Sequence, residues 1–133
     1  MKVTFQHLDD DHDPRNGEVL DEPAVIGLLD DLRTTRPPIM YQFVGDNGFN
    51  LTIGIDNGFG CIQYSRNDGL PPYIMATDPT QGVSNSTDME FVVGGTLTPI
   101  EGKYRVRFDL VRDVLLEFAQ SGERSEAVHW LEF

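Results

Sequence analysis

Two stretches of the chain place apolar residues at helical spacing. The first begins after Asp21, whose side chain can cap the exposed amides of a first helical turn. Its apolar stripe consists of Val25, Ile26, Leu28, Leu29 and Leu32. The second stretch covers about residues 107–121 and stops at Gly122, a residue type that commonly ends helices. Its buried side is expected to consist of Val111, Val114, Leu115 and Phe118.

Between these two helices, apolar and polar residues alternate, which predicts β-strands. The clearest pair is residues 49–56 and 59–66, joined by Asn57-Gly58, a dipeptide that type I′ hairpin turns favour. Further strands are expected at residues 3–6, 39–45, 73–76, 89–93 and 128–133. Residues 96–100 are expected to continue the strand at 89–93 after a bend, and residues 77–88 to form a polar loop.

This order of elements predicts an α+β fold. The sheet should be mainly antiparallel, with about six strands, and the two helices should pack on one of its faces. At 133 residues the chain fits a single domain over residues 1–133.

The chain is strongly acidic, with 22 Asp and Glu against 10 Lys and Arg and a formal net charge of −12. This charge argues against nucleic acid and anionic membranes as partners, because Lys and Arg are needed to neutralise phosphate. A basic protein partner and a plain role in solubility fit it equally well. Residues 1–31 hold nine acids against Lys2 and Arg15, so one part of the surface is expected to be strongly negative.

The sequence shows no sign of secretion or membrane insertion. Residues 1–9 contain no apolar signal segment, and no run approaches the roughly 18 apolar residues of a membrane span. Cys61 is the only cysteine, which rules out a disulfide framework within one chain. We therefore expect a cytoplasmic protein.

Groups that could carry chemistry are scattered. His7, His12 and His129 belong to no recognised nucleophile or metal motif, and Cys61 inside a strand suits core packing better than catalysis. The acidic segment at residues 7–13 lacks the glycine of a calcium-binding EF-hand loop, so a solvated loop is the better interpretation. The many acids leave open a small hydrolase with two converging carboxylates. Our prediction is a protein that is not an enzyme and needs no cofactor or metal.

The last third of the chain carries a degenerate motif. A helix ends in Glu117-Phe118, and the residues that follow at intervals are Gly122, Arg124, Val128, Trp130 and Glu132. Upstream of this helix lie Phe91, Gly94 and Gly95. Over about residues 22–133 the pattern resembles the first-numbered family of immunity proteins from bacterial polymorphic toxin systems, although Ser125 stands where that family often has proline. The resemblance implies a cytoplasmic antidote that blocks the active site of a cognate toxin domain, often a nucleic-acid deaminase.

Resemblance and charge together suggest how the protein binds. One face of the sheet and its connecting loops would present carboxylates to a toxin domain with a basic surface. The candidate contacts are Asp46, Asp56, Asp68, Asp78, Asp88 and Glu90, with Tyr64 and Tyr73 as aromatic anchors. The free protein is expected to be a monomer or a weak homodimer. The alternative is an acidic regulatory or structural binding module for another basic protein.

Overall fold

The computed structural model describes residues 1–80 and 87–132. Its elements are β1 (Val3–Gln6), α1 (Glu22–Leu32), β2 (Met40–Gly45), β3 (Phe49–Asp56), β4 (Phe59–Arg66), β5 (Ile74–Thr77), β6 (Met89–Val93), β7 (Thr96–Ile100), the 3-10 turn η2 (Gly102–Tyr104), β8 (Val106–Arg107), α2 (Phe108–Ser121) and β9 (His129–Glu132). Residues 81–86 of the predicted loop 77–88, and Phe133 at the end of the predicted last strand, lie outside the described residues.

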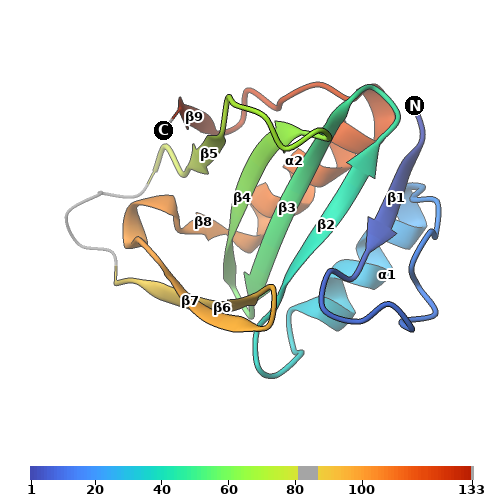
Figure 1. Cartoon of the computed structure of the whole chain (residues 1–133). Coiled ribbons are helices and arrows are strands. Elements are labelled where there is room, and N and C mark those ends of the chain that lie inside the picture. Colours follow the sequence, from blue (N-terminus) through green and yellow to red (C-terminus); the bar gives the residue numbers. More distant parts are fainter. Residues whose placement is uncertain (81–86, 133) are drawn as a thin grey trace.

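The main sheet is antiparallel throughout, in the order β1-β2-β3-β4-β5-β9, and the short β8 pairs with β4 beside this path (Figure 1). Its centre is the β3–β4 hairpin, in which Asp56 pairs with Phe59 across the Asn57-Gly58 turn. Asn57 has a φ of 54°, the left-handed conformation that this turn requires. The predicted α+β fold is confirmed, with β8 as a strand that the sequence did not indicate.

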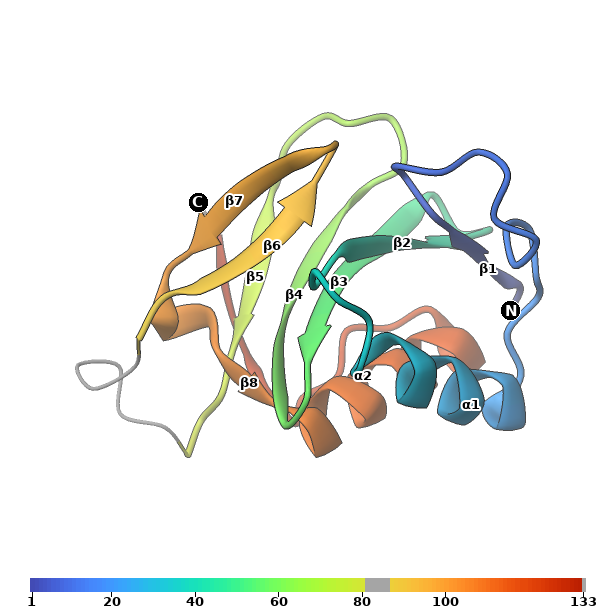
Figure 2. The same cartoon turned by 90° about the horizontal axis from the view of Figure 1, so that it is seen from below.

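Both helices cover the same face of the sheet, as Figure 2 shows. Asp21 caps α1 as predicted, since its side chain accepts a 2.9 Å hydrogen bond from the Ala24 N–H. The apolar sides of α1 and α2 close over the strands, so that Leu29, Phe43 and Leu115 are fully buried in one core. The predicted helices on one face are therefore confirmed.

The opposite face of the sheet is partly covered by a β-hairpin that the sequence did not predict. β6 and β7 pair with each other antiparallel, and the turn between them uses Gly94 (φ 57°) and Gly95 (φ 77°). The expectation that residues 96–100 continue the preceding strand is wrong, because two left-handed residues in succession reverse the chain. The hairpin places Phe91 in a second small core with Met40, Cys61, Met75 and Met89.

Candidate functional site

Four segments of the chain meet at one end of the main sheet, which we call the loop end. They are residues 1–2, the β2–β3 turn at 46–48, the β4–β5 loop at 67–73 and the α2–β9 loop at 122–126. The Lys2 N–H donates a 3.2 Å hydrogen bond to the Asp46 carboxylate, and the Asn67 N–H donates a 2.8 Å bond to the Gly48 carbonyl. Hydrogen bonds from backbone N–H groups therefore join segments that are separated along the chain.

Gly122 joins the helical layer to this end. It ends α2 in a left-handed conformation (φ 74°), and its N–H donates to the Phe118 carbonyl at 2.8 Å. Its own carbonyl accepts a 3.1 Å hydrogen bond from the Asn47 amide. A Cβ at this position would collide with Met1 Sδ and Asn47 Nδ2. The left-handed turn and the close approach of the Met1 and Asn47 side chains both favour glycine at this position.

The α2–β9 loop surrounds an open hollow of about 580 Å³, which we call the Trp130 hollow. Its lining residues are Tyr64, Gly122, Glu123, Arg124, Ser125, Glu126, Val128 and Trp130. Four residues of the motif in the last third, Gly122, Arg124, Val128 and Trp130, therefore line the hollow.

The aromatic wall of the Trp130 hollow is held in place from several sides. The Trp130 indole N–H donates a 2.8 Å hydrogen bond to the Ser125 carbonyl. The Tyr64 and Trp130 rings meet edge to face at 6.1 Å, and the Arg124 guanidinium lies 5.5 Å from the centre of the Tyr64 ring. Ring contacts and a hydrogen bond together give these side chains a defined orientation before any partner arrives.

Two carboxylates, those of Glu123 and Glu126, line the same hollow, and both residues are exposed. Neither has an ion-pair partner among residues 1–80 and 87–132. An opening with the partly exposed Trp130 ring and two available carboxylates suits a Lys or Arg side chain. These two acids are not among the predicted contacts, and the signal that could have indicated them is the polar turn after the helix.

Of the predicted contacts, Asp46, Asp68 and Tyr73 lie at the loop end, and all three are exposed. Asp68 accepts a 3.0 Å hydrogen bond from the Leu70 N–H and forms an ion pair with Arg66. The Leu70 hydrogen bond, followed by the contact with Arg66, lowers the pKa of Asp68. The Tyr73 hydroxyl donates a 2.6 Å hydrogen bond to the Gly69 carbonyl, which holds the loop closed on itself.

Tyr64 and Asp78 are placed less favourably for contact with a partner. Tyr64 is only 8% exposed, because its ring meets Phe118 of α2 edge to face and stacks on Phe49 at 5.0 Å. The Asp78 side chain is fully buried and forms an ion pair with Arg107 at 3.0 Å. Burial raises the pKa of Asp78, but hydrogen bonds from Thr80 and Arg107 outweigh it and lower the pKa overall.

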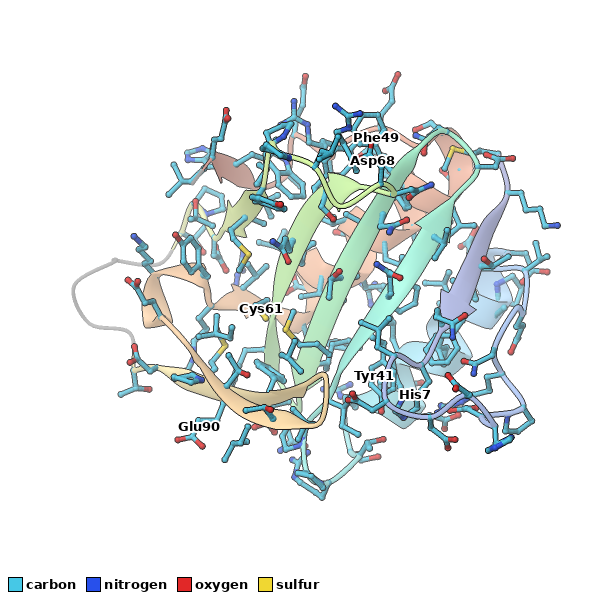
Figure 3. The ribbon with its side chains drawn as sticks, viewed as in Figure 1. His7, Tyr41, Phe49, Cys61, Asp68 and Glu90 are labelled. Atoms are coloured by element: carbon cyan, nitrogen blue, oxygen red, sulfur yellow. The ribbon has the colours of Figure 1, made fainter. Side chains whose placement is uncertain are left out.

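The other three predicted contacts lie away from the loop end. Asp56, at the opposite end of β3, pairs with Arg36 at 2.8 Å, and Asp88 accepts a 3.0 Å hydrogen bond from the Gly102 N–H. Glu90 is exposed on β6, and Figure 3 shows it far from Asp68. The structure therefore does not bring the six predicted acids together on one surface.

Negative charge is concentrated away from the loop end. There, Asp46, Asp68, Glu123 and Glu126 face Lys2, Arg66 and Arg124, so the charges nearly balance. Residues 9–31, by contrast, hold nine acids and a single base. That base, Arg15, is paired with Asp13 at 2.7 Å. The strongly negative region expected from the sequence therefore comprises the loop before α1 and α1 itself.

The cysteine and the carboxylates that could carry catalysis lie in environments that do not favour it. Cys61 is fully buried, and burial raises the pKa of its thiol to about 12. Asp13, Asp68 and Asp78 all have lowered pKa values, whereas a carboxylic acid acting as general acid needs a raised one. No group of His, Cys, Asp or Glu that could hold a metal ion occurs within the described residues. Among those same residues, no helix is long and apolar enough to cross a membrane.

Comparison with known proteins agrees with this picture of a binding protein. The family model described as Immunity protein Imm1 matches residues 11–132, which is most of the chain and includes the whole α2–β9 segment. No curated protein matches the chain. Members of this family are not enzymes but inhibitors that bind a cognate toxin. The chain therefore belongs to the Imm1 family of immunity proteins, and its function is to neutralise such a toxin.

Proposed function

We propose that this immunity protein acts in the cytoplasm on a toxin of the nucleic-acid deaminase type, and that the loop end covers the mouth of the toxin's substrate site. A toxin that acts on nucleic acid needs Lys and Arg around its active site to hold the phosphate backbone. An inhibitor that engages those same side chains excludes the substrate directly. The toxin contacts assigned here are Glu123 and Glu126 in the Trp130 hollow, and Asp46, Asp68 and Tyr73 elsewhere at the loop end.

The observation that carries this proposal is the arrangement of the Trp130 hollow. Trp130, which is partly exposed, supplies an aromatic face, and Glu123 and Glu126 supply carboxylates that the described part of the chain leaves unpaired. A toxin Arg or Lys inserted there would gain cation–π and ion-pair contacts in one place. Interfaces usually depend on a few anchors of this kind at their centre, with Trp, Tyr and Arg enriched among them.

The overall charge would assist capture without defining the contact. A net charge of −12 attracts a basic toxin over distances comparable with the Debye length, about 10 Å at 0.1 M salt. Association should therefore slow several-fold between low and physiological salt, while a toxin already bound should dissociate at nearly the same rate. Fast capture matters because a free toxin damages the cell that makes it.

The test is to produce the chain together with the toxin domain encoded by the neighbouring gene. We expect the two proteins to co-purify, cells making the toxin to survive only when the chain is present, and Glu123→Lys/Glu126→Lys to weaken binding at least tenfold. Glu90→Lys is the matched control, because Glu90 is an exposed acid away from the loop end. Loss of co-purification together with loss of protection would reject this toxin as the partner. If Glu123→Lys/Glu126→Lys and Glu90→Lys bind the toxin equally tightly, the Trp130 hollow is rejected as the site.

A further inference from the structure

A second hollow lies between the start of α1 and the last turns of α2, and we call it the α1–α2 groove. It has a volume of about 570 Å³. Its lining residues are Met1, Val19, Leu20, Asp21, Glu22, Leu116, Ala119 and Gln120. Figure 2 shows α1 and α2 side by side on the face of the sheet turned away from the β6–β7 hairpin. The groove therefore opens on the helical side of the molecule.

The floor of this groove is apolar and its rim includes apolar side chains that are exposed to water. Leu20 and Ala119 are 4% and 9% exposed, whereas Val19 and Met1 are 52% and 43% exposed. An exposed Val or Met alone needs no explanation. Two of them beside a hollow of this size with an apolar floor are typical of a surface that a partner covers.

Charge identifies the kind of partner. One side of the groove is formed by residues 19–22, which belong to the most acidic part of the chain, residues 9–31, and Glu22 stands on its edge in the first turn of α1. Glu22 has no ion-pair partner in the portion of the chain that the structure describes. An occupant must therefore combine an apolar side chain for the floor with basic residues for the rim.

The groove also borders the loop end. Met1 lines the groove, and its Sδ lies so close to Gly122 that a Cβ there would collide with it. Gly122 in turn lines the Trp130 hollow. The two hollows are thus neighbours across one residue pair, within reach of a single protein partner.

We propose that the α1–α2 groove binds an apolar side chain from a basic segment of the same toxin that docks at the loop end. This inference rests on the proposed function, because it assigns the toxin a second contact rather than a different partner. The apolar contact would chiefly slow dissociation, and the surrounding acids would chiefly speed association. The groove would hold a part of the toxin beyond its substrate mouth, which would make the inhibitor specific for one toxin among others with similar active sites.

The experiment measures binding of purified full-length variants to a catalytically inactive form of the toxin domain encoded by the neighbouring gene. Val19→Asp should weaken binding at least tenfold, mostly through faster dissociation. The matched control is Leu97→Asp, which makes a similar change at a side chain 56% exposed on β7. Glu22→Lys should slow association several-fold at low salt, and Glu90→Lys should leave it within twofold. If Val19→Asp lowers thermal stability, Gln120→Arg places a bulky cation at the exposed helical edge of the groove and should weaken binding equally.

The outcomes separate this inference from the function on which it rests. If the wild type binds the toxin and Val19→Asp and Gln120→Arg bind it equally tightly, the groove contact is overturned. The immunity function at the loop end would then still stand. A wild-type chain that does not bind the toxin at all would overturn both. A concentration-dependent dimer of the free chain that Val19→Asp abolishes would assign the groove to a second copy of this protein, which also contradicts the proposal.

Discussion

The Trp130 indole N–H donates a 2.8 Å hydrogen bond to the Ser125 carbonyl, and this bond ties the α2–β9 loop to the strand that follows it. Ser125 is 4% exposed, so few water molecules could bind its carbonyl if the indole N–H were removed. The loop carries Glu123 and Glu126, whose positions therefore depend on Trp130. A single side chain thus supports both the packing of β9 and the shape of the Trp130 hollow.

Trp130→Phe tests this dependence, because it keeps an aromatic ring and removes the donor. We expect a loss of about 1–2 kcal/mol in the free energy of unfolding, measured by urea denaturation. Toxin dissociation should also become several-fold faster, since the loop is held less firmly. Leu131→Ala is the control, because Leu131 is the next residue of β9 and is 45% exposed. An equal effect of both substitutions on dissociation would show that the hydrogen bond does not shape the site.

Gly122→Ala and Gly95→Ala form a matched pair with similar φ angles, 74° and 77°. A Cβ at Gly95 meets nothing within 4 Å, so Gly95→Ala should cost only about 1 kcal/mol of backbone strain. Gly122→Ala should cost more, because Met1 and Asn47 must also move and the Asn47 hydrogen bond is disturbed. Thermal denaturation measures the difference. Toxin affinity should fall in Gly122→Ala alone, and a fall of the same size in Gly95→Ala would contradict the assignment of the loop end.

Asp78→Asn should destabilise the protein in a pH-dependent way. The pKa of Asp78 is lowered from its ordinary value of 3.8 on folding, so its ionised carboxylate stabilises the folded state above that value. This contribution is lost as the pH falls through the lowered pKa. Denaturant unfolding should show Asp78→Asn less stable than the wild type by about 2 kcal/mol at pH 7, with a difference that shrinks below about pH 4. A constant difference from pH 7 to pH 3 would mean that ionisation of Asp78 does not support the fold.

Residues 1–133 should unfold as one domain, and Cys61 provides a direct probe. The thiol is buried and its pKa is raised to about 12, so it should react with a thiol reagent at pH 8 only when the protein unfolds. The labelling transition in urea should therefore coincide with the transition measured by circular dichroism. Labelling at much lower urea would indicate that the sheet and the β6–β7 hairpin separate before the helical side unfolds.

Local chemistry explains which parts of the fold could be predicted from the sequence. Asn57-Gly58 specifies a hairpin turn, Asp21 a helix start and Gly122 a helix end, and all three depend on residues close in the chain. The direction of the chain after Gly94-Gly95 could not be predicted in the same way. Two glycines permit a bend or a full reversal, and the packing of Phe91 against Met40 and Met75 decides between them.

The candidate site was predicted less completely, because it depends on contacts between distant residues. Asn47 and Gly122 are 75 residues apart, and no periodicity indicates that the two loops meet. Asp46 and Asp68 are among the predicted contacts, and the fold places both at the loop end. Asp78 belongs to the same prediction, but its buried side chain pairs with Arg107. Composition indicates that acids are plentiful and does not indicate which of them are already paired.

Competition for the toxin tests the central claim most directly. The measurement is binding of a labelled nucleic acid to the inactive toxin domain, titrated with wild-type chain, Glu123→Lys/Glu126→Lys or Glu90→Lys. The account predicts that one equivalent of wild-type chain or of Glu90→Lys displaces the nucleic acid, and that the double variant needs at least tenfold more. A complex of chain and toxin that still binds nucleic acid, or a double variant that displaces it as well as the wild type, would contradict the account.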